Sequence, residues 1–522
     1  MSSKVNDFLH ELIHSLSKSE KRYFKLLSSR HTIGEENNYI VLFDYIESQD
    51  QYDEPTLIRH FSGQAFLNKL SITKKRLYNH ILGALDNFHA QANVESQIFK
   101  MIHSAEILSQ KSLYDQSIKI LLSAEKLAKK NDYTNLLIHI RSKIKALIEK
   151  NNYLDIQSVE LQFILDTDQE LLAQSREEIT LWNLKSHLFQ HMAFHGIART
   201  QEEKTKYEAF YLKYLEAPVT EKSSAESNYL ALHLQSAYFF SVQDSANSLL
   251  KLQENLSLFQ QDERLMKKFP ERYFSILSNL IYTTESLNQT KASDDYLTEL
   301  KRFENEIQSQ SNDIDLQLKL FTTVASIEIS SLTRKGEFQK ALHQLPELEK
   351  GLLKNRDKIS PIRNAFLHYK MATVYLSTGK VLLAQKEVRK ILNDTELDKK
   401  EDIVAFSHLL ELFIQIETGD MEFLNYSCRS AKRFLSSRKR MYGMEQELLS
   451  FAQKYISVKN TFDAEERWQK LYAKLSNLAK DPYQASALEY FDFLTWALAK
   501  ANNGSFEQLS KEKFNKGFSS AA

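Results

Sequence analysis

The chain has 522 residues, of which only 11 are glycine and 6 are proline. Average proteins contain about 7% glycine and about 5% proline, so this composition excludes turn-rich β-sandwiches and barrels and the glycine-loop nucleotide-binding folds. Lysine plus arginine and aspartate plus glutamate number 68 each. This balance leaves no overall field that would gather nucleic acid or an anionic membrane, so any polyanion site has to be local.

Cysteine usage and hydropathy indicate the compartment. The single cysteine, Cys428, can form neither an intramolecular disulfide nor a zinc cluster with other cysteines, which is typical of a reducing environment. Residues 1–16 carry charges and histidines among their apolar positions, unlike a signal peptide. No uncharged apolar stretch approaches the roughly 20 residues of a membrane-spanning helix. We therefore expect a cytoplasmic protein without a membrane span.

Residues 1–92 are expected to form an N-terminal helical domain. Ser17 and Glu20 make a capping-box pattern at the start of one helix, and Asp53 with Pro55 supplies the N-cap and the first-turn proline of another. The segment from Pro55 through Lys74, Lys75 and Arg76 resembles a helix-turn-helix, which would make the chain a transcription regulator with a DNA-binding head and a repeat sensor. A plain helical cap explains the same residues.

The sharpest chemical motif in this domain is His10-Glu11-Leu12-Ile13-His14, an HExxH sequence. On a helix it places two imidazoles one turn apart beside a carboxylate, as in zinc hydrolases, with Glu35 or Glu36 as a third ligand. Zinc peptidases have a sheet before the motif helix, whereas only nine residues precede it here. We therefore interpret the segment as a short amphipathic helix and keep the hydrolase as a remote alternative.

The region 93–440 is periodic, with turns that recur about every 40 to 47 residues, the length of one helical hairpin plus a connector. Such hairpins cannot bury their apolar faces alone, so they are expected to stack as a solenoid. The turns lie near Ser112, Asn152, Gly196, Gln243, Gln289, Gly336, Gly379 and Gly419.

One hairpin carries a specific pattern: Ala372, Tyr375, Gly379 and Ala384 have the mutual spacings of the tetratricopeptide-repeat signature. Small residues let the two helices approach closely, and glycine accepts the positive φ between them. The chain therefore resembles tetratricopeptide-repeat-like α-solenoid proteins. Parts of the pattern recur at Phe338 and Ala341 near Gly336, at Asp420 and Ala431 near Gly419, and at Ala105, Tyr114 and Ala124 near Ser112.

The resemblance implies an all-α fold, an α–α superhelix of about eight tetratricopeptide-repeat-like hairpins with helical caps at both ends. It also implies that the first helix of each hairpin lines a concave groove for a peptide or protein partner. The alternative, that several of these side chains only pack between repeats, stays open. The groove-facing positions implied by the signature are Ser330, Arg334, Phe366, Tyr369, Thr373, Phe406, Leu409 and Phe413.

Residues 425–444 contain no acidic side chain and include a basic patch of Arg429, Lys432, Arg433 and Arg440. On a helix, part of this patch would fall near one face and could contact phosphates or an acidic peptide, although a solvated face explains it equally.

The C-terminal end divides into two expected regions. Residues 441–502 should form capping helices, the last of which is capped by Asp481, opened by Pro482 and sealed by an aromatic block from Tyr490 to Trp496. Residues 503–522 are rich in glycine, serine and lysine and are expected to be a disordered tail.

Taken together, these patterns favour a non-enzymatic scaffold that binds a protein or peptide partner. No catalytic residues, metal ligands or cofactors are predicted, and nucleic acid is a less favoured partner. The sequence does not identify the partner or the oligomeric state.

Overall fold

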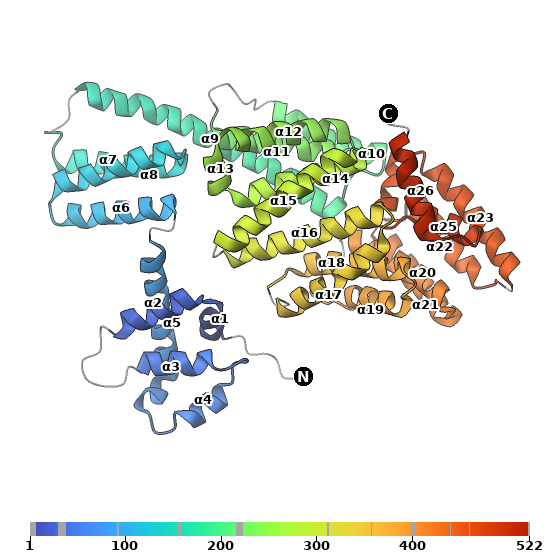
Figure 1. Cartoon of the computed structure of the whole chain (residues 1–522). Helices are drawn as coiled ribbons and strands as arrows, with labels where there is room; N and C mark the ends of the chain where they lie inside the picture. The colour runs from blue at the N-terminus through green and yellow to red at the C-terminus, as the bar shows by residue number, and fades with distance from the viewer. Residues whose placement is uncertain are drawn as a thin grey trace. The chain divides into compact units, whose positions relative to one another are not determined.

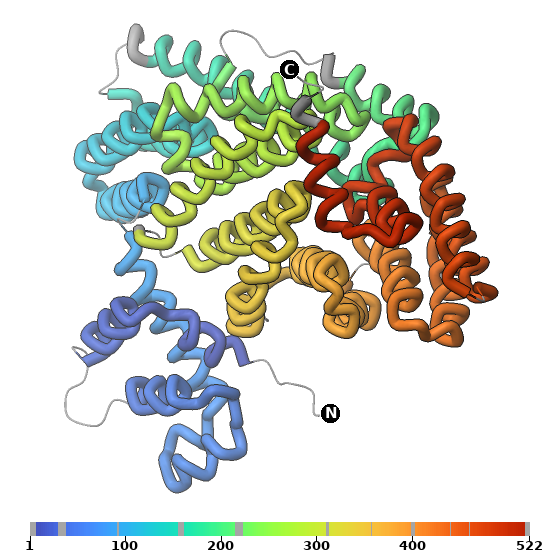
Figure 2. Tube along the Cα trace, turned by 45° about the vertical axis from the view of Figure 1, so that its right-hand side comes forward, coloured from blue at the N-terminus to red at the C-terminus, as the bar shows by residue number. Residues whose placement is uncertain are grey.

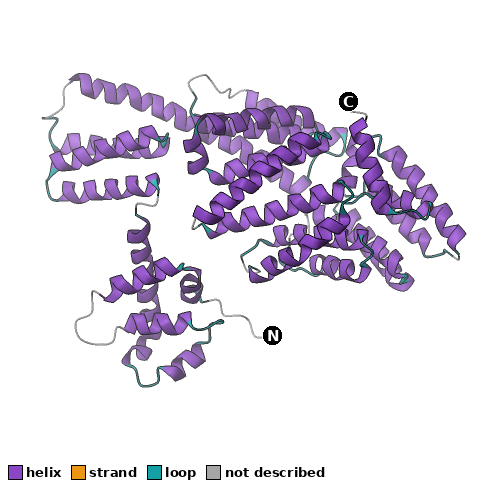
Figure 3. Cartoon of the chain, in the orientation of Figure 1, coloured by secondary structure: helices purple, strands orange, loops and turns teal. Residues whose placement is uncertain are grey.

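The computed structural model describes residues 7–29, 38–90, 93–154, 158–215, 223–310, 313–355, 358–397, 402–438, 440–458 and 460–519. Within these ranges all regular secondary structure is helical and no strand occurs (Figure 3), so the predicted all-α class is confirmed. None of the helices in the described ranges combines the length and apolar character needed to cross a bilayer. The chain divides into two compact units, Met1–Ser175 and Arg176–Ala522 (Figure 1).

Unit 1 begins with helices that enclose one core around Phe24, Leu42 and Leu77. Both helix-start predictions are confirmed: the Ser17 N–H donates to the Glu20 carboxylate at 2.7 Å, and Asp53 caps its helix by accepting the Thr56 N–H at 3.2 Å. The elements are α1 (Phe8–Ser15), α2 (Lys18–Ser29), α3 (Asn38–Glu47), α4 (Glu54–His60), the 3-10 helix η1 (Ala65–Lys69) and α5 (Leu70–His89).

A second core in unit 1 joins α6 (Val94–Gln110), α7 (Tyr114–Lys130), α8 (Thr134–Lys150) and the first part of α9 (Ser158–His195). Ile98, Ile140 and Ile144 are buried at its centre. Ile140 and Ile144 lie about one turn apart on α8, which is the amphipathic pattern from which the helices were expected. The boundaries predicted at residues 92 and 440 stay predictions.

Unit 2 consists of helices that pack largely as neighbouring pairs, such as α11 with α12, α14 with α15, α18 with α19 and α20 with α21 (Figures 1 and 2). Its elements are α10 (Gln201–Leu215), α11 (Ala225–Ser241), α12 (Ser245–Gln261), α13 (Glu263–Lys268), α14 (Pro270–Ser286), α15 (Thr290–Gln310), α16 (Ile314–Arg334), α17 (Phe338–Lys354), α18 (Pro361–Ser377), α19 (Val381–Leu392), α20 (Asp402–Thr418), α21 (Met421–Ser437), α22 (Gly443–Tyr455), α23 (Thr461–Leu478), α24 (Pro482–Ala485), the 3-10 helix η2 (Ser486–Glu489), α25 (Phe493–Ala501) and α26 (Phe506–Ser519).

The expected turns between helices carry a left-handed residue whether or not glycine is present. Lys380 N–H donates to the Tyr375 carbonyl across the Gly379 turn, and Asp244 N–H donates to the Phe239 carbonyl across the Gln243 turn, both at 2.8 Å. This bond satisfies a carbonyl that the helix end would otherwise leave free. Positive φ occurs at Ser112, Asn152, Gly196, Gln243, Gly336, Gly379 and Gly419, and at Asn288 beside the expected Gln289.

The C-terminal end differs from the prediction in two respects. The single helix expected after Pro482 breaks into α24, η2 and α25, because Asp492 caps a new helix by accepting the Thr495 N–H at 3.0 Å. Within the expected disordered tail, Phe506–Ser519 instead form α26, and residues 520–522 lie outside the described residues. The Phe506 ring stacks on the Phe338 ring at a centroid distance of 5.1 Å, and this one aromatic anchor outweighs the polar composition around it.

Candidate functional site

The predicted groove positions fall into two groups, and the larger group is not accessible. Tyr369, Thr373, Phe406, Leu409 and Phe413 are buried, none with more than 7% of its surface exposed. These five side chains therefore do not line an open groove in this structure.

The smaller group reaches the surface of unit 2. Phe366 is 37% exposed, whereas Ser330 and Arg334 are half-buried. The Ser330 hydroxyl donates to the Ser326 carbonyl at 2.8 Å, and the Arg334 guanidinium donates to the Glu285 carbonyl at 2.6 Å. Among the predicted positions, Phe366 alone combines exposure with a side chain that is not already bonded within the chain.

The C-terminal segment of the same unit covers the buried positions. The Tyr490 ring stacks on Phe406 with centroids 3.8 Å apart and meets Tyr369 edge-on at 6.3 Å. Phe493 contacts Phe413 at a centroid distance of 4.8 Å. The aromatic block expected to seal the last hairpin therefore packs against α18 and α20, and the chain itself occupies this part of the helix surface.

An open groove of about 580 Å³ lies on helices α11, α14, α16 and α18, and side chains of α9 and α12 also line it. Three of these helices contribute side chains at the same spacing, i, i+1, i+4 and i+5, which places four residues on one helix face. Because the spacing is the same, α14, α16 and α18 each turn an equivalent helix face toward the groove. The residues are Ser278, Asn279, Tyr282 and Thr283 on α14, Thr322, Thr323, Ser326 and Ile327 on α16, and Ile362, Arg363, Phe366 and Leu367 on α18.

Aromatic side chains provide the apolar part of this groove. Phe240 on α11 meets Tyr282 on α14 edge-to-face at a centroid distance of 5.7 Å, and Phe366 lies on α18. Rings fixed on rigid helices offer large contact areas at small entropic cost, as in the anchor pockets of protein interfaces.

Polar side chains occupy the second position of the repeated spacing on each helix. Asn279, Thr323 and Arg363 stand there, and within the described part of the chain none makes a side-chain hydrogen bond or ion pair. His233 lines the groove on α11. Burial, followed by the charges of Lys185 and Arg272, lowers the pKa of His233 to about 4, so its imidazole is neutral at pH 7. The groove thus presents free donors beside apolar rings, which suits an extended peptide backbone.

The predicted basic patch is only partly formed. Arg429, Lys432 and Arg433 are exposed on α21. Arg440 instead turns inward and pairs with Asp402 at 3.1 Å, with 11% of its side chain exposed. The patch therefore consists of three cations, because the chain reverses direction after α21 and carries Arg440 into the interior.

An interior ion pair that no sequence motif signals joins distant parts of unit 2. Arg199 donates to the Glu445 carboxylate, with one Nη2–Oε2 distance of 3.3 Å, and its Nε donates to the Tyr483 carbonyl at 3.0 Å. The guanidinium also lies 4.3 Å from the centroid of the Tyr442 ring. The two charges are 246 residues apart in the sequence, and periodicity could not have paired them.

The two HExxH histidines each contact a backbone carbonyl oxygen in unit 1. His10 Nε2 lies 2.8 Å from the Gln49 carbonyl oxygen and His14 Nε2 lies 3.3 Å from the Ile46 carbonyl oxygen. Both bonds join α1 to the backbone at and just after the end of α3, and each occupies one of the two ring nitrogens of its histidine. Residues 35 and 36, named as a third ligand, lie outside the described residues, and no group of three metal-binding side chains occurs among those described.

One of the three cations on which the helix-turn-helix hypothesis depends is ion-paired within the chain. Lys74 pairs with Asp7 and with Glu54, the latter at 2.9 Å, and its Nζ donates to the Tyr52 hydroxyl oxygen at 2.6 Å. These partners raise the pKa of Lys74 against the lowering effect of burial. Lys75 and Arg76 remain exposed and make no ion pair with a described residue, so α5 presents two cations to solvent.

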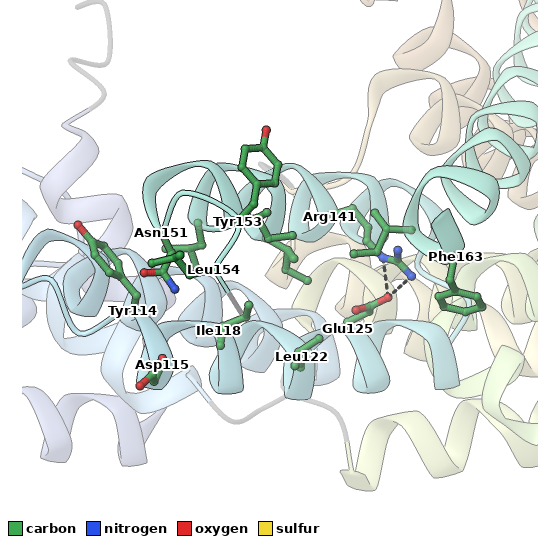
Figure 4. Close-up of a pocket in the computed structure, with 14 residues that line it drawn as sticks. Tyr114, Asp115, Ile118, Leu122, Glu125, Arg141, Asn151, Tyr153, Leu154 and Phe163 are labelled. Atoms are coloured by element: carbon green, nitrogen blue, oxygen red, sulfur yellow. Dashed lines mark hydrogen bonds and ion pairs between the residues drawn. The ribbon is translucent and has the colours of Figure 1, made fainter. Parts of the chain in front are cut away.

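Unit 1 has an apolar groove of its own, about 680 Å³ in volume, formed by α7, α8 and the start of α9 (Figure 4). Ile118 and Leu122 lie along one side and Phe163 at one end. Arg141 and Glu125 form an ion pair beside Phe163, with Nε 2.6 Å from Oε1. Besides this ion pair the groove is lined, among the described residues, by one more charged side chain, the exposed Asp115, and otherwise mainly by apolar ones.

No protein-family model matches the sequence, and no curated protein matches it. The assignment of a function therefore depends on the residues and their geometry.

We expect the Arg199–Glu445 pair to stabilise unit 2 strongly. Arg199→Met leaves a buried carboxylate without its counter-charge and should lower the free energy of unfolding by about 3 kcal/mol, whereas adding Glu445→Leu should recover at least half of that loss. All three tryptophans, Trp182, Trp468 and Trp496, lie in unit 2, so denaturant unfolding followed by tryptophan fluorescence reports on this unit. A double variant no more stable than the single one would contradict the pairing.

We also expect a pH dependence from Glu411 on α20. Burial raises the pKa of this carboxyl to about 7, against a hydrogen bond from Gln415 at 2.6 Å and the field of Arg389. The folded state thus holds a proton that the unfolded state releases near pH 4.5, so this contribution to stability is full below about pH 4.5 and is lost as the pH rises through 7.

Replacing Glu411 with Gln removes this titration. Relative to the parent protein, Glu411→Gln should gain about 3 kcal/mol of unfolding free energy between pH 4.5 and pH 8, measured by denaturant unfolding at each pH. Parallel stability curves for the two proteins would show that the carboxyl does not titrate in this range.

Proposed function

We propose that the chain is a non-enzymatic scaffold that binds a protein partner in the unit 2 groove. The observation that carries the proposal is the repeated lining of α14, α16 and α18, where the same four positions of each helix face one groove. Repeat proteins bind extended segments on such surfaces, because each repeat presents equivalent side chains at a regular interval.

The architecture within this proposal is a tetratricopeptide-repeat-like superhelix of about eight hairpins. The left-handed turn residues at the expected positions support it, as does the packing of neighbouring helix pairs. The groove shifts toward the N-terminal side of the positions implied by the signature, because the C-terminal segment covers α20 and part of α18. A cytoplasmic location belongs to the same proposal and is supported by the single, buried cysteine.

Groove variants test this function by recovery of partners. Affinity purification from the native host, read by mass spectrometry, should recover a partner with the parent protein. Asn279→Ala combined with Phe366→Ala should reduce that partner at least tenfold, because an anchoring ring and a free donor are lost from one surface.

The matched control removes two exposed rings elsewhere in unit 2. Tyr426 and Phe462 are 58% and 75% exposed and lie outside the groove, so Tyr426→Ala with Phe462→Ala should leave recovery unchanged. Circular dichroism should show that both double variants are folded. A partner that is retained by the groove variant and lost by the control would place binding elsewhere.

A further inference from the structure

The described side chains that line the unit 2 groove include a positive charge and no negative one. Among the described residues that line it there is no aspartate or glutamate, whereas Arg363 on α18 lines it and makes no side-chain ion pair or hydrogen bond with a described residue. Burial lowers the pKa of this half-buried guanidinium, and the fields of Asp315 and Glu271 only partly oppose that effect. Arg363 is therefore a cation that has lost part of its hydration without gaining a partner.

The two acids that act on Arg363 make their ion pairs with another side chain, Lys319. Lys319 Nζ lies 2.7 Å from the Glu271 carboxylate and 2.5 Å from the Asp315 carboxylate. Lys319 carries one positive charge against their two, so both acids still act on Arg363 through their field. Neither of them makes an ion pair or a hydrogen bond with its guanidinium among the described residues, so the guanidinium donors are open to a carboxylate from a partner.

A second cation without an ion pair stands near the α11 side of the groove. Lys185 on α9 is half-buried, and burial, followed by the neighbouring Arg272, lowers its pKa. Glu226, the acid that opposes this shift, already accepts a hydrogen bond from Arg272 at 2.8 Å. Lys185 and Arg363 are therefore two cations without an ion pair among the described residues, the first beside His233 and the second on α18.

The chain's own C-terminal segment shows how the adjoining surface receives an acidic residue. Glu489 accepts a hydrogen bond from the hydroxyl of Tyr282, which also lines the groove, and the next residue, Tyr490, stacks on Phe406. Burial lowers the pKa of Lys370, and Glu489 is one of the acids that oppose this shift. An acid followed by an aromatic ring is thus bound next to the open part of the groove.

We propose that the partner segment in this groove is extended and acidic, with carboxylates that pair with Arg363 and Lys185 and an apolar or aromatic side chain held between Phe240 and Phe366. This inference rests on the proposed binding function. Helices pack 8–10 Å apart, so helices α11, α14, α16 and α18 together span roughly 30 Å, which an extended segment of about ten residues would cover. Charge-assisted hydrogen bonds to a partly desolvated arginine are among the stronger single contacts in an interface.

Fluorescence anisotropy with three labelled peptides of about ten residues tests the proposal on the full chain. All three contain the same tyrosine and phenylalanine, and their remaining positions are aspartate and glutamate, asparagine and glutamine, or lysine. The acidic peptide should bind at least tenfold more tightly than the neutral one, and the lysine peptide should bind weakest.

Variants then locate the charge effect. Arg363→Gln should weaken the acidic peptide about tenfold and leave the neutral peptide unchanged, and Lys185→Gln should act in the same direction. Arg433→Gln removes an exposed cation from α21, outside the groove, and should change nothing. Thermal unfolding of each variant checks that the fold is kept.

The outcomes separate the two claims. Equal binding of all three peptides, lost on Phe366→Ala, would overturn the acidic preference and keep the groove as a binding site. An acidic preference that Arg433→Gln reduces as much as Arg363→Gln would overturn the assignment to Arg363. Absence of binding by every peptide would count against the groove and the acidic segment together.

Discussion

A helical hairpin cannot bury both faces of its first helix against its own second helix, and unit 2 is organised by this constraint. Neighbouring pairs pack against each other, and one face of each first helix remains available to another segment or a partner. On α18 and α20 the C-terminal segment covers this face, through Tyr490 and Phe493. On α11, α14, α16 and the start of α18 the corresponding face remains open as the groove.

Local signals in the sequence predicted local structure well. The Ser17–Glu20 capping box and the Asp53 cap form as expected because each depends on residues within one turn. The turns at Gly336 and Gly379 were found from glycine, and that at Gln243 from spacing alone. In each case the physical cause lies within a few residues, where a sequence pattern can register it.

Contacts between distant residues could not be predicted in the same way. Arg199 gives no sign that it pairs with Glu445, and Arg440 stands in a basic run although it points inward to Asp402. The tetratricopeptide-repeat signature implied Tyr369 and Phe413 as groove positions, yet nothing in it records that Tyr490 and Phe493 cover them. Only Phe366 among those positions lines the open groove, and the polar row of Asn279, Thr323 and Arg363 was missed, although its equal register on three helices is visible once the helix bounds are known.

The central claim is that a partner lies against α14, α16 and α18, and a photo-crosslinker placed in the native host tests it most directly. A benzophenone amino acid at Thr323, in the middle of the polar row, should form a covalent adduct with a partner protein on irradiation. The same amino acid at Phe462, which is 75% exposed on α23, should not form that adduct. An adduct at Phe462 together with none at Thr323 would contradict the account.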